Sequence, residues 1–307
     1  MTNRIVWQTR PNGQGLDGRV AVLDNGHGGL LEVWPALGFN AYRWSMQARE
    51  LLYADPQLFE NGRPTRSGIP VLFPFPNRIR AGTFAWDGKT YRLPLNGPAG
   101  KNAIHGWACR SAWRVIDEGD DAASAWLTGE FVLSRDAPDA RLLWPADARL
   151  RLTYRLLEDR LRIEAEVGAP DAPLPFGLGY HPYFALAAFG GEDAIVVVPA
   201  HRYWELNENL PTGVQHPVAG ARDLRFGRPL AGLVLDDVLT DLPAPPPDAD
   251  SGVGLLGIVR HPSGGPALRL YGSADFREVV VFTPPHRQAV CLEPYTCTTD
   301  ADRKSVV

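Results

Sequence analysis

Residues 149–167 carry the feature that most restricts the fold, because polar and apolar side chains alternate there in regular order. The apolar members are Leu150, Leu152, Tyr154 and Leu156, followed after Glu158-Asp159 by Leu161, Ile163, Ala165 and Val167. Successive side chains of a β-strand point to opposite faces, so a period of two places the apolar members on one face. The stretch therefore predicts a β-hairpin with one buried and one solvated face.

Short strand-like runs bounded by turn residues recur along the chain. The clearest is a second hairpin, in which residues 84–86 and 89–93 flank the turn dipeptide Asp87-Gly88. Other expected strands lie at residues 20–23, 30–34, 40–46, 112–116, 125–133, 194–198, 202–206, 268–271, 279–282 and 290–292. The proline-rich residues 243–250 are expected to form an extended surface loop.

The abundance of glycine and proline argues against a long helical bundle. The chain has 31 Gly and 28 Pro among 307 residues, and proline removes a helix donor and clashes with the preceding turn. Hydrophobic residues make up 45%, which is enough for a large core. We therefore expect an all-β fold, a large antiparallel β-sandwich with a barrel as the alternative, and a single domain over residues 1–307.

Charge and cysteine content narrow the function classes. The formal net charge of −4 is not the basic balance typical of nucleic-acid binding. The N-terminal residues lack the apolar core of a signal peptide, and no apolar run is long enough to span a membrane, so we expect a cytoplasmic protein. Cys109, Cys291 and Cys297 have neither CxxC spacing nor a nearby histidine pattern, which argues against a zinc site and against a disulfide framework.

Glu293 stands out because it ends an apolar strand-like run and is followed by Pro294 and Tyr295. Partial desolvation raises the pKa of a carboxyl group toward the range that suits a general base. A structural ion pair with one of the many arginines is the alternative explanation. The position by itself leaves both open.

Two histidines and an arginine lie in other segments rich in glycine and proline. His181 precedes Pro182, and His105 precedes Gly106. Imidazole is the commonest proton donor near neutral pH, and glycine lets a ligand approach closely. Arg78 can offer a planar fork of donors to ligand oxygens. The alternatives are a buried or turn histidine and a solvated surface arginine.

Together these segments resemble the aldose 1-epimerase (mutarotase) family. The motifs that carry the resemblance occur in the family's order: Pro76-Asn77-Arg78-Ile79, Gly82-Thr83-Phe84, Asp87-Gly88-Lys89-Thr90-Tyr91-Arg92-Leu93, Asn102 with His105-Gly106, Gly179-Tyr180-His181-Pro182-Tyr183-Phe184, Leu235-Asp236-Asp237 and Leu292-Glu293-Pro294. The resemblance implies the galactose mutarotase type of β-sandwich. It also implies interconversion of the α and β anomers of a hexose by ring opening and reclosure, with no metal or organic cofactor.

The resemblance further implies a role for each matched residue. Glu293 matches the general base that takes the proton from the C1 hydroxyl, and His181 matches the general acid that protonates the ring oxygen. The other matched residues are expected to bind and polarise substrate oxygens or to hold sugar hydroxyls: His105, Arg78, Asn77 and Asp236. Trp107 is expected to contact the sugar, although aromatic side chains equally fill cores.

Several points stay open at this stage. Residues 105–110 resemble the hexose-6-phosphate 1-epimerase branch of the family, and Arg66 and Arg110 are candidates to meet a phosphate. Asp237 is the alternative to Asp236 as a sugar ligand. A non-catalytic sugar-binding sandwich is a further alternative. The expected partner is a small-molecule sugar, without nucleic acid or membrane, for a monomer or homodimer.

Overall fold

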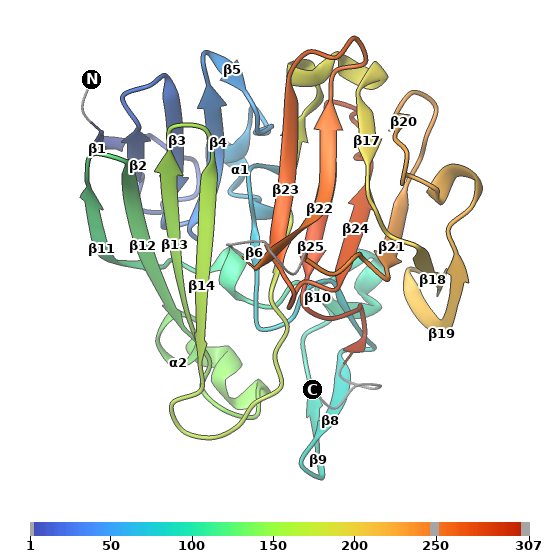
Figure 1. The fold of residues 1–307 in the computed structure, drawn as a ribbon. Helices are drawn as coiled ribbons and strands as arrows, with labels where there is room; N and C mark the ends of the chain where they lie inside the picture. Colours follow the sequence, from blue (N-terminus) through green and yellow to red (C-terminus); the bar gives the residue numbers. More distant parts are fainter. Residues whose placement is uncertain (1–2, 246–251, 302–307) are drawn as a thin grey trace.

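The computed structural model describes residues 3–245 and 252–301. The strands of the first two sheets are β1 (Arg4–Thr9), β2 (Arg19–Asp24), β3 (Gly29–Trp34), β4 (Asn40–Met46) and β5 (Arg49–Glu50), and β11 (Arg114–Asp120), β12 (Ser124–Val132), β13 (Arg149–Leu157) and β14 (Leu161–Gly168). Both sheets are antiparallel meanders in chain order, and they form the left half of the molecule in Figure 1.

The right half of Figure 1 holds the C-terminal strands. One sheet has the order β19 (Leu210–Pro217), β18 (Arg202–Asn207), β21 (Asp236–Thr240), β24 (Glu278–Phe282), β25 (Ala289–Tyr295), β15 (Gly179–Tyr180) and β6 (Val71–Leu72), with β16 (Tyr183–Ala185) also pairing with β25. A second sheet has the order β20 (Arg228–Pro229), β17 (Ile195–Val197), β22 (Val253–Arg260) and β23 (Ala267–Ser273).

Two small pairs and short helices complete the described elements. The pairs are β7 (Arg78–Arg80) with β10 (Asn102–Ile104), and β8 (Thr83–Trp86) with β9 (Lys89–Arg92). The helices are α1 (Leu58–Asn61) and α2 (Leu133–Asp136), and the 3-10 turns η1 (Pro64–Arg66), η2 (Pro98–Gly100), η3 (Ala108–Arg110), η4 (Pro138–Leu143), η5 (Leu186–Phe189), η6 (Gly191–Asp193) and η7 (Gly220–Arg222).

The alternating segment folds as its periodicity predicts. β13 and β14 pair antiparallel, and Leu150, Leu152 and Leu156 of β13 are fully buried while its arginines are half-exposed. Burying a leucine side chain contributes roughly 1.5–3 kcal/mol. The apolar residues of β14 are only half-buried or exposed, because β14 forms the edge of its sheet. The hairpin is thus confirmed, with its buried face concentrated on β13.

One continuous core joins the layers. It contains Leu152 of β13, Val33 of β3, Val196 of β17 and Leu292 of β25, so the sheets pack face to face. The expected all-β antiparallel sandwich is therefore confirmed.

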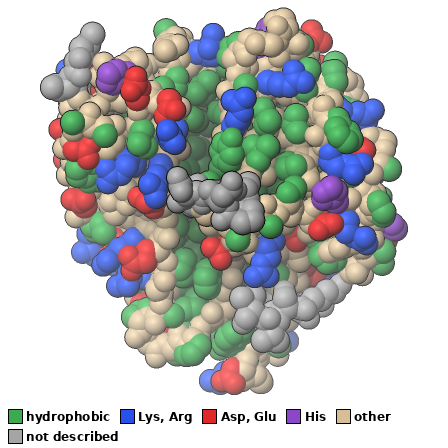
Figure 2. Space-filling view, in the orientation of Figure 1, with side chains coloured by type: hydrophobic (Ala, Val, Ile, Leu, Met, Phe, Trp, Pro, Cys, Tyr) green, Lys and Arg blue, Asp and Glu red, His purple; other side chains and the backbone are tan. Residues whose placement is uncertain are grey.

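On the face shown in Figure 2, basic and acidic side chains are interspersed among apolar ones. None of the helices in residues 3–245 and 252–301 is long and apolar enough to cross a membrane. The second predicted hairpin is present as β8 and β9. Most of the proline-rich segment expected to form a loop, residues 246–250, lies outside the described residues.

Candidate active site

Strand β25 supplies the acidic group of the candidate site. Its side chains alternate: Val290 and Leu292 enter the main core, whereas Cys291, Glu293 and Tyr295 point to the opposite face of the sheet. Every residue of this strand is buried, and Glu293 is only 2% exposed. The strand is buried on both sides because it lies near the middle of its sheet, between β24 and the short strands β15 and β16.

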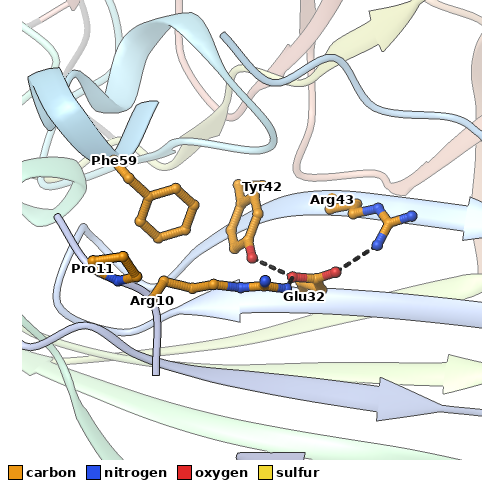
Figure 3. A pocket seen from close by; sticks show the side chains of 6 residues that line it. All are labelled: Arg10, Pro11, Glu32, Tyr42, Arg43 and Phe59. Carbon is orange, nitrogen blue, oxygen red and sulfur yellow. Dashed lines mark hydrogen bonds and ion pairs between the residues drawn. The ribbon is translucent and has the colours of Figure 1, made fainter. Parts of the chain in front are cut away.

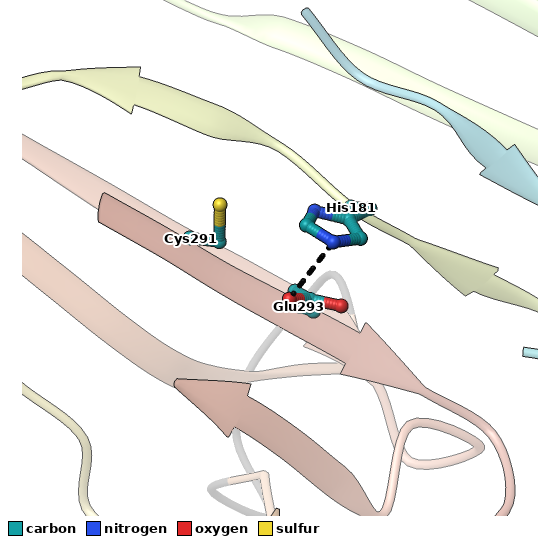
Figure 4. A group of neighbouring side chains, drawn as sticks. All are labelled: His181, Cys291 and Glu293. Atoms are coloured by element: carbon teal, nitrogen blue, oxygen red, sulfur yellow. Dashed lines mark ion pairs between the residues drawn. The ribbon is translucent and has the colours of Figure 1, made fainter. Parts of the chain in front are cut away.

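His181 lies directly across from this carboxylate. It follows β15, and its backbone N–H donates to the Pro70 carbonyl at 3.0 Å, which fixes the chain where the imidazole leaves it. Its Nε2 atom is 3.3 Å from Glu293 Oε1, and both side chains are more than 90% buried. Figure 4 shows the two groups facing each other, with Cys291 beside them on β25. A histidine and a carboxylate at this distance can exchange a proton directly.

The second oxygen of the carboxylate has its own partner. The Tyr295 hydroxyl donates a hydrogen bond to Glu293 Oε2 from the next residue on the same face of β25. The tyrosine ring lies against Gly179, where an added Cβ atom would be 2.5 Å from its Cδ1 atom. A side chain at position 179 would therefore push Tyr295 away from the carboxylate. The two oxygens of Glu293 are thereby distinguished, one facing His181 and the other Tyr295.

Burial shifts the pKa values of the pair in opposite directions. Burial lowers the pKa of His181 to about 3. Burial also raises the pKa of Glu293 well above its ordinary value, although the Tyr295 hydrogen bond and the charge of Arg78 act against it. Each shift favours the uncharged form of its group, the neutral imidazole and the protonated carboxyl group. The neutral pair is therefore favoured, with one proton on the carboxyl group and a neutral imidazole.

Tyr183 completes the surroundings of the imidazole. Its ring stacks on His181 with centroids 4.7 Å apart, and its hydroxyl donates to the Thr65 carbonyl at 2.5 Å. Phe282 of β24 meets the imidazole edge-on at 6.2 Å. These contacts hold the ring plane and keep it in apolar surroundings, which accounts for its low pKa.

His105 and Asn77 form a second unit beside the pair. The Asn77 backbone N–H donates to His105 Nδ1 at 3.2 Å, so the imidazole carries its proton on Nε2. Both residues have positive φ, +65° and +52°, which is uncommon for side-chain-bearing residues and marks a constrained backbone. Gly106 also has positive φ and lies against the Phe73 carbonyl, where no Cβ would fit. The His105 and His181 rings are 5.7 Å apart, so the constrained turn presents an N–H donor next to the acid–base pair.

Arg78 contributes the positive charge of the site. Its Nη1 atom donates to the side chain of Asn77 at 2.8 Å. Its charge lowers the pKa values of Glu293 and Asp236, although burial raises both on balance. Arg78, Glu293 and Asp236 are therefore neighbours in space despite their separation in sequence.

Strand register separates the two aspartates that the sequence left open. On β21, Asp236 is opposite Phe282, which is opposite Cys291, so Asp236 shares the face of β25 that carries Glu293. Asp237 points the other way and forms an ion pair with Arg222 at 2.6 Å. Only Asp236 of the two is on the side where a sugar would meet the acid–base pair.

Trp107 is placed differently from the other expected ligands. Its ring makes edge contacts with Phe75 and Trp144, at centroid distances of 6.0 and 5.8 Å, and packs against the main core. Its backbone N–H donates to the Phe73 carbonyl at 3.0 Å. These contacts give Trp107 a packing role next to the His105 turn, and its contact with a sugar stays a prediction.

A separate hollow of about 340 Å³ is formed by residues of the N-terminal sheet and α1. Glu32 lies at its base and accepts hydrogen bonds from Tyr42, Arg10 and Arg43 (Figure 3). Burial raises the pKa of Glu32, but these hydrogen bonds outweigh it and lower the pKa overall. Because both carboxylate oxygens are occupied, we interpret this group as a structural ion-pair network.

Sequence reasoning missed three residues of the site as it is built. Tyr295, Cys291 and Tyr183 all contact or adjoin the acid–base pair, and none was assigned a role in advance. Each lies two residues from Glu293 or His181. For Cys291 and Tyr295, which lie on β25 with Glu293, the period of two that identified the strands was the available signal, because it places such neighbours on one face.

Comparisons with known proteins identify the family of this chain. Residues 42–305 match the family described as aldose 1-epimerase. The chain is 34% identical over 158 residues to the galactose mutarotase of Rattus norvegicus, covering 48% of this chain and 42% of that protein. It is 24% identical over 237 residues to the uncharacterised protein YihR of Escherichia coli (strain K12), covering 75% of this chain and 70% of that protein.

A solved structure extends the likeness to the whole fold. The crystal structure of a galactose mutarotase-like protein from Clostridium acetobutylicum superposes with a TM-score of 0.88 at 21% identity, covering 100% of this chain and 92% of that one. At this identity the likeness shows the fold. The fold and the family match define a protein with the galactose mutarotase-like fold. This chain belongs to the aldose 1-epimerase family.

Proposed function

We propose that this protein is an aldose 1-epimerase that interconverts the α and β anomers of a hexose. The observation that carries the proposal is the 3.3 Å approach of His181 Nε2 to Glu293 Oε1 in a buried site. Ring opening requires a proton to leave the C1 hydroxyl and a proton to reach the ring oxygen. These oxygens are bonded to the same carbon atom, so a base and an acid in contact with each other can serve both.

The proton balance of the reaction follows from these roles. Ionised Glu293 takes the proton of the C1 hydroxyl while protonated His181 gives its proton to the ring oxygen. The C1–O5 bond breaks and the C1–O1 bond becomes a carbonyl, which yields the open-chain aldehyde. The dyad is then neutral. Rotation about C1–C2 turns the other face of the carbonyl toward O5, and reclosure with both proton transfers reversed gives the opposite anomer.

The burial of the pair fits this cycle. The neutral pair that burial favours is the state of the dyad when the open-chain sugar is bound. Ring opening starts from the ion pair, which forms when a proton crosses from Oε1 to Nε2. Sugar hydroxyls placed against the two groups supply hydrogen bonds that stabilise their charged forms.

The neighbouring residues have complementary roles in the proposal. His105 offers its Nε2–H to a substrate oxygen, because its Nδ1 is already occupied by the Asn77 N–H. Arg78 offers positive charge beside the carboxylate. Asp236 accepts from sugar hydroxyls at the rim of the site. None of these groups forms a covalent bond with the sugar.

A phosphorylated hexose is the second candidate substrate, and one observation favours it. Arg66 of η1 and Arg110 of η3 lie on 3-10 turns that contact each other, and both are exposed. Neither forms an ion pair with any residue in the described part of the chain. The charge of Arg66 acts to lower the pKa of Tyr183, and the charge of Arg110 acts to lower the pKa of His105. Both arginines are therefore close to the candidate site.

Saturation-transfer NMR tests the proposed function and separates the candidates. Irradiating the C1 proton of one anomer and measuring the signal of the other reports exchange directly. We expect added protein to accelerate exchange of glucose or galactose well above the buffer rate. Acceleration confined to glucose 6-phosphate identifies the phosphorylated substrate. Protection of the protein by sugars against thermal unfolding, without faster exchange, indicates a non-catalytic sugar-binding sandwich and contradicts the proposal.

A further inference from the structure

Three potential metal ligands meet at one point of the candidate site. A ring nitrogen of His181, Sγ of Cys291 and a carboxylate oxygen of Glu293 all lie within 4.8 Å of one another, and all three residues are buried. Figure 4 shows the thiol rising from β25 beside the imidazole, with the carboxylate two residues further along the strand. Because His181 is far from the other two residues in the sequence, the three do not form a metal-binding motif of short spacing.

We propose that His181, Cys291 and Glu293 form a binding site for a borderline-soft divalent cation of the Zn²⁺ type, and that its occupation excludes the sugar. Nitrogen, sulfur and oxygen donors together suit Zn²⁺, whereas Mg²⁺ and Ca²⁺ prefer oxygen ligands alone. Three protein ligands leave a fourth position of the tetrahedron open to water or a hydroxyl group.

The distances fit a tetrahedral ion after small side-chain movements. Zinc bonds of roughly 2.0–2.3 Å at tetrahedral angles place the ligand atoms about 3.3–3.6 Å apart. His181 Nε2 and Glu293 Oε1 already lie 3.3 Å apart. The Sγ atom of Cys291 must move closer to these two atoms to complete the ligand set. Rotation about the Cα–Cβ bond of Cys291 moves Sγ without moving β25, whose backbone is fixed by pairing to β24 and β16.

The ligand groups are not committed elsewhere in a way that blocks the ion. Glu293 uses Oε2 for Tyr295, which leaves Oε1 to the ion. The ring nitrogen Nδ1 of His181 is buried without a hydrogen-bond partner in the described residues, so the proton can remain there while Nε2 offers its lone pair. Binding forms three coordinate bonds and releases the thiol proton, together with the carboxyl proton when that group is protonated.

Occupation of this site has a functional consequence that rests on the proposed function. The ion would lie between Nε2 and Oε1, where O1 and O5 of the sugar must receive and give their protons. Sugar and ion would therefore compete for the same space. The metal binding itself is independent of whether the protein epimerises sugars.

Co²⁺ tests the site without reference to activity, because a tetrahedral Co²⁺–thiolate complex absorbs strongly in the visible and near ultraviolet. We expect Co²⁺ added to the full-length protein to give saturable bands that Zn²⁺ abolishes and Mg²⁺ does not. Cys291→Ser should lose the thiolate band and bind Zn²⁺ at least about tenfold more weakly by calorimetric titration, since even loss of an outer partner costs roughly 10- to 100-fold. Cys297→Ser is the matched control and should keep both signals.

A second measurement uses anomer exchange in the presence of Zn²⁺. We expect Zn²⁺ to raise the apparent KM for the sugar without lowering kcat, and any exchange that Cys291→Ser supports should be less sensitive to the ion. Retention of the cobalt band in Cys291→Ser, or no saturable band in the wild type, overturns the metal site. If the protein accelerates no exchange, the proposed function fails while the cobalt spectrum still decides the site. Circular dichroism of each variant checks that it is folded, and His181→Asn offers a second test of the same ligand set.

Discussion

The Tyr295 hydroxyl donates to Oε2 of Glu293, two residues earlier on the same face of β25. The other oxygen of that carboxylate faces His181. Strand β25 therefore supplies both the proposed base and its hydrogen-bond donor. The spacing of two residues places the Tyr295 and Glu293 side chains on the same face, and Gly179 on the paired strand leaves room for the tyrosine ring. A carboxylate held in this way presents a single oxygen to the substrate and to the acid.

Tyr295→Phe tests this support. Removing the hydroxyl loses a hydrogen bond to a charged group, which is worth roughly 1.5–3 kcal/mol, so we expect kcat to fall roughly 10- to 100-fold. The hydrogen bond lowers the pKa of Glu293, and its loss therefore makes the carboxylate harder to ionise. The midpoint at which Glu293 loses its proton should move to higher pH in a titration followed by carbon-detected NMR.

Tyr180→Phe is the matched control for that variant. Tyr180 is also buried, on the paired strand β15, and burial alone raises its pKa. Its hydroxyl forms no hydrogen bond with a carboxylate among the described residues. We expect Tyr180→Phe to keep the kcat and the Glu293 titration of the wild type. Equal losses in the two variants would mean that Tyr295 acts through packing alone.

The pH dependence of the reaction is a second consequence of burial. The dyad is active when it holds one proton between its two members. With ordinary pKa values of 4.5 for Glu and 6.5 for His, the ion pair would exist only between those limits. Burial lowers the pKa of His181 to about 3, so the lower limit of the one-proton state moves down from 4.5, and burial raises the pKa of Glu293, so that this carboxyl group sets the upper limit.

We therefore expect kcat for anomer exchange to stay level as pH falls through 4.5, the ordinary pKa of a glutamate carboxyl group. The measurement is the exchange rate at saturating sugar across the pH range in which the protein remains folded. A decline in kcat centred on that pH would indicate an ordinary, solvated carboxyl group and would contradict the electrostatic account of the pair.

Glu278 provides a test of stability that is independent of the reaction. It lies on β24 opposite Tyr295 and is 5% exposed, with Oε1 accepting from Trp204 and Oε2 without a partner in the described residues. Burial raises its pKa to about 7 from 4.5. Because the folded protein holds this proton more tightly than the unfolded chain, the contribution to stability is complete below pH 4.5 and is lost as pH rises through about 7.

Glu278→Gln removes this titration while keeping the shape of the side chain. The free energy of unfolding of the wild type should fall by roughly 3 kcal/mol relative to the variant between about pH 4.5 and 7.5, because each tenfold difference in proton affinity between the folded and unfolded chain is worth about 1.4 kcal/mol. Urea unfolding at several pH values measures this difference. A difference that does not change with pH would show that the carboxyl group has an ordinary pKa.

The two adjacent aspartates should separate binding from stability. Asp236→Asn removes a carboxylate on the sugar side of β21, so we expect KM to rise roughly tenfold, about 1.4 kcal/mol, with little change in stability. Asp237→Asn removes the partner of Arg222, which is half-exposed, so we expect unfolding to become easier by roughly 1 kcal/mol with KM unchanged. Steady-state exchange kinetics and urea unfolding measure the two effects. The opposite outcome would assign the sugar contact to Asp237.

The sequence predicts local structure well wherever alternation is strong. The hairpin of β13 and β14, and the pair β8 and β9, follow from periodicity and a turn dipeptide. The strand expected at residues 112–116 was placed too early, since β11 starts at Arg114. Trp113 before it is buried, and its ring donates a hydrogen bond to the Ala108 carbonyl. Tertiary contacts of this kind decide where a strand begins, and they have no local signature.

The candidate site was likewise predictable from the sequence only in part. Motifs pointed to Glu293 and His181 separately, but their 3.3 Å approach depends on the pairing of β25 with β15 and β16, which joins distant segments. The choice between Asp236 and Asp237 likewise needed the register of β21 against β24. The partner of Glu293 was within reach of the sequence, because Tyr295 lies two residues away on a strand.

The most direct test of the central claim is anomer exchange by Glu293→Gln and His181→Asn, measured by saturation transfer with the sugar that the wild type accelerates. Glu293→Gln keeps the size of the side chain and His181→Asn keeps a smaller polar one, and the two variants remove proton transfer at Oε1 and at Nε2, respectively. We predict that exchange falls to the buffer rate in both variants, while circular dichroism shows them folded. Exchange at the wild-type rate in either folded variant would contradict the proposed acid–base pair.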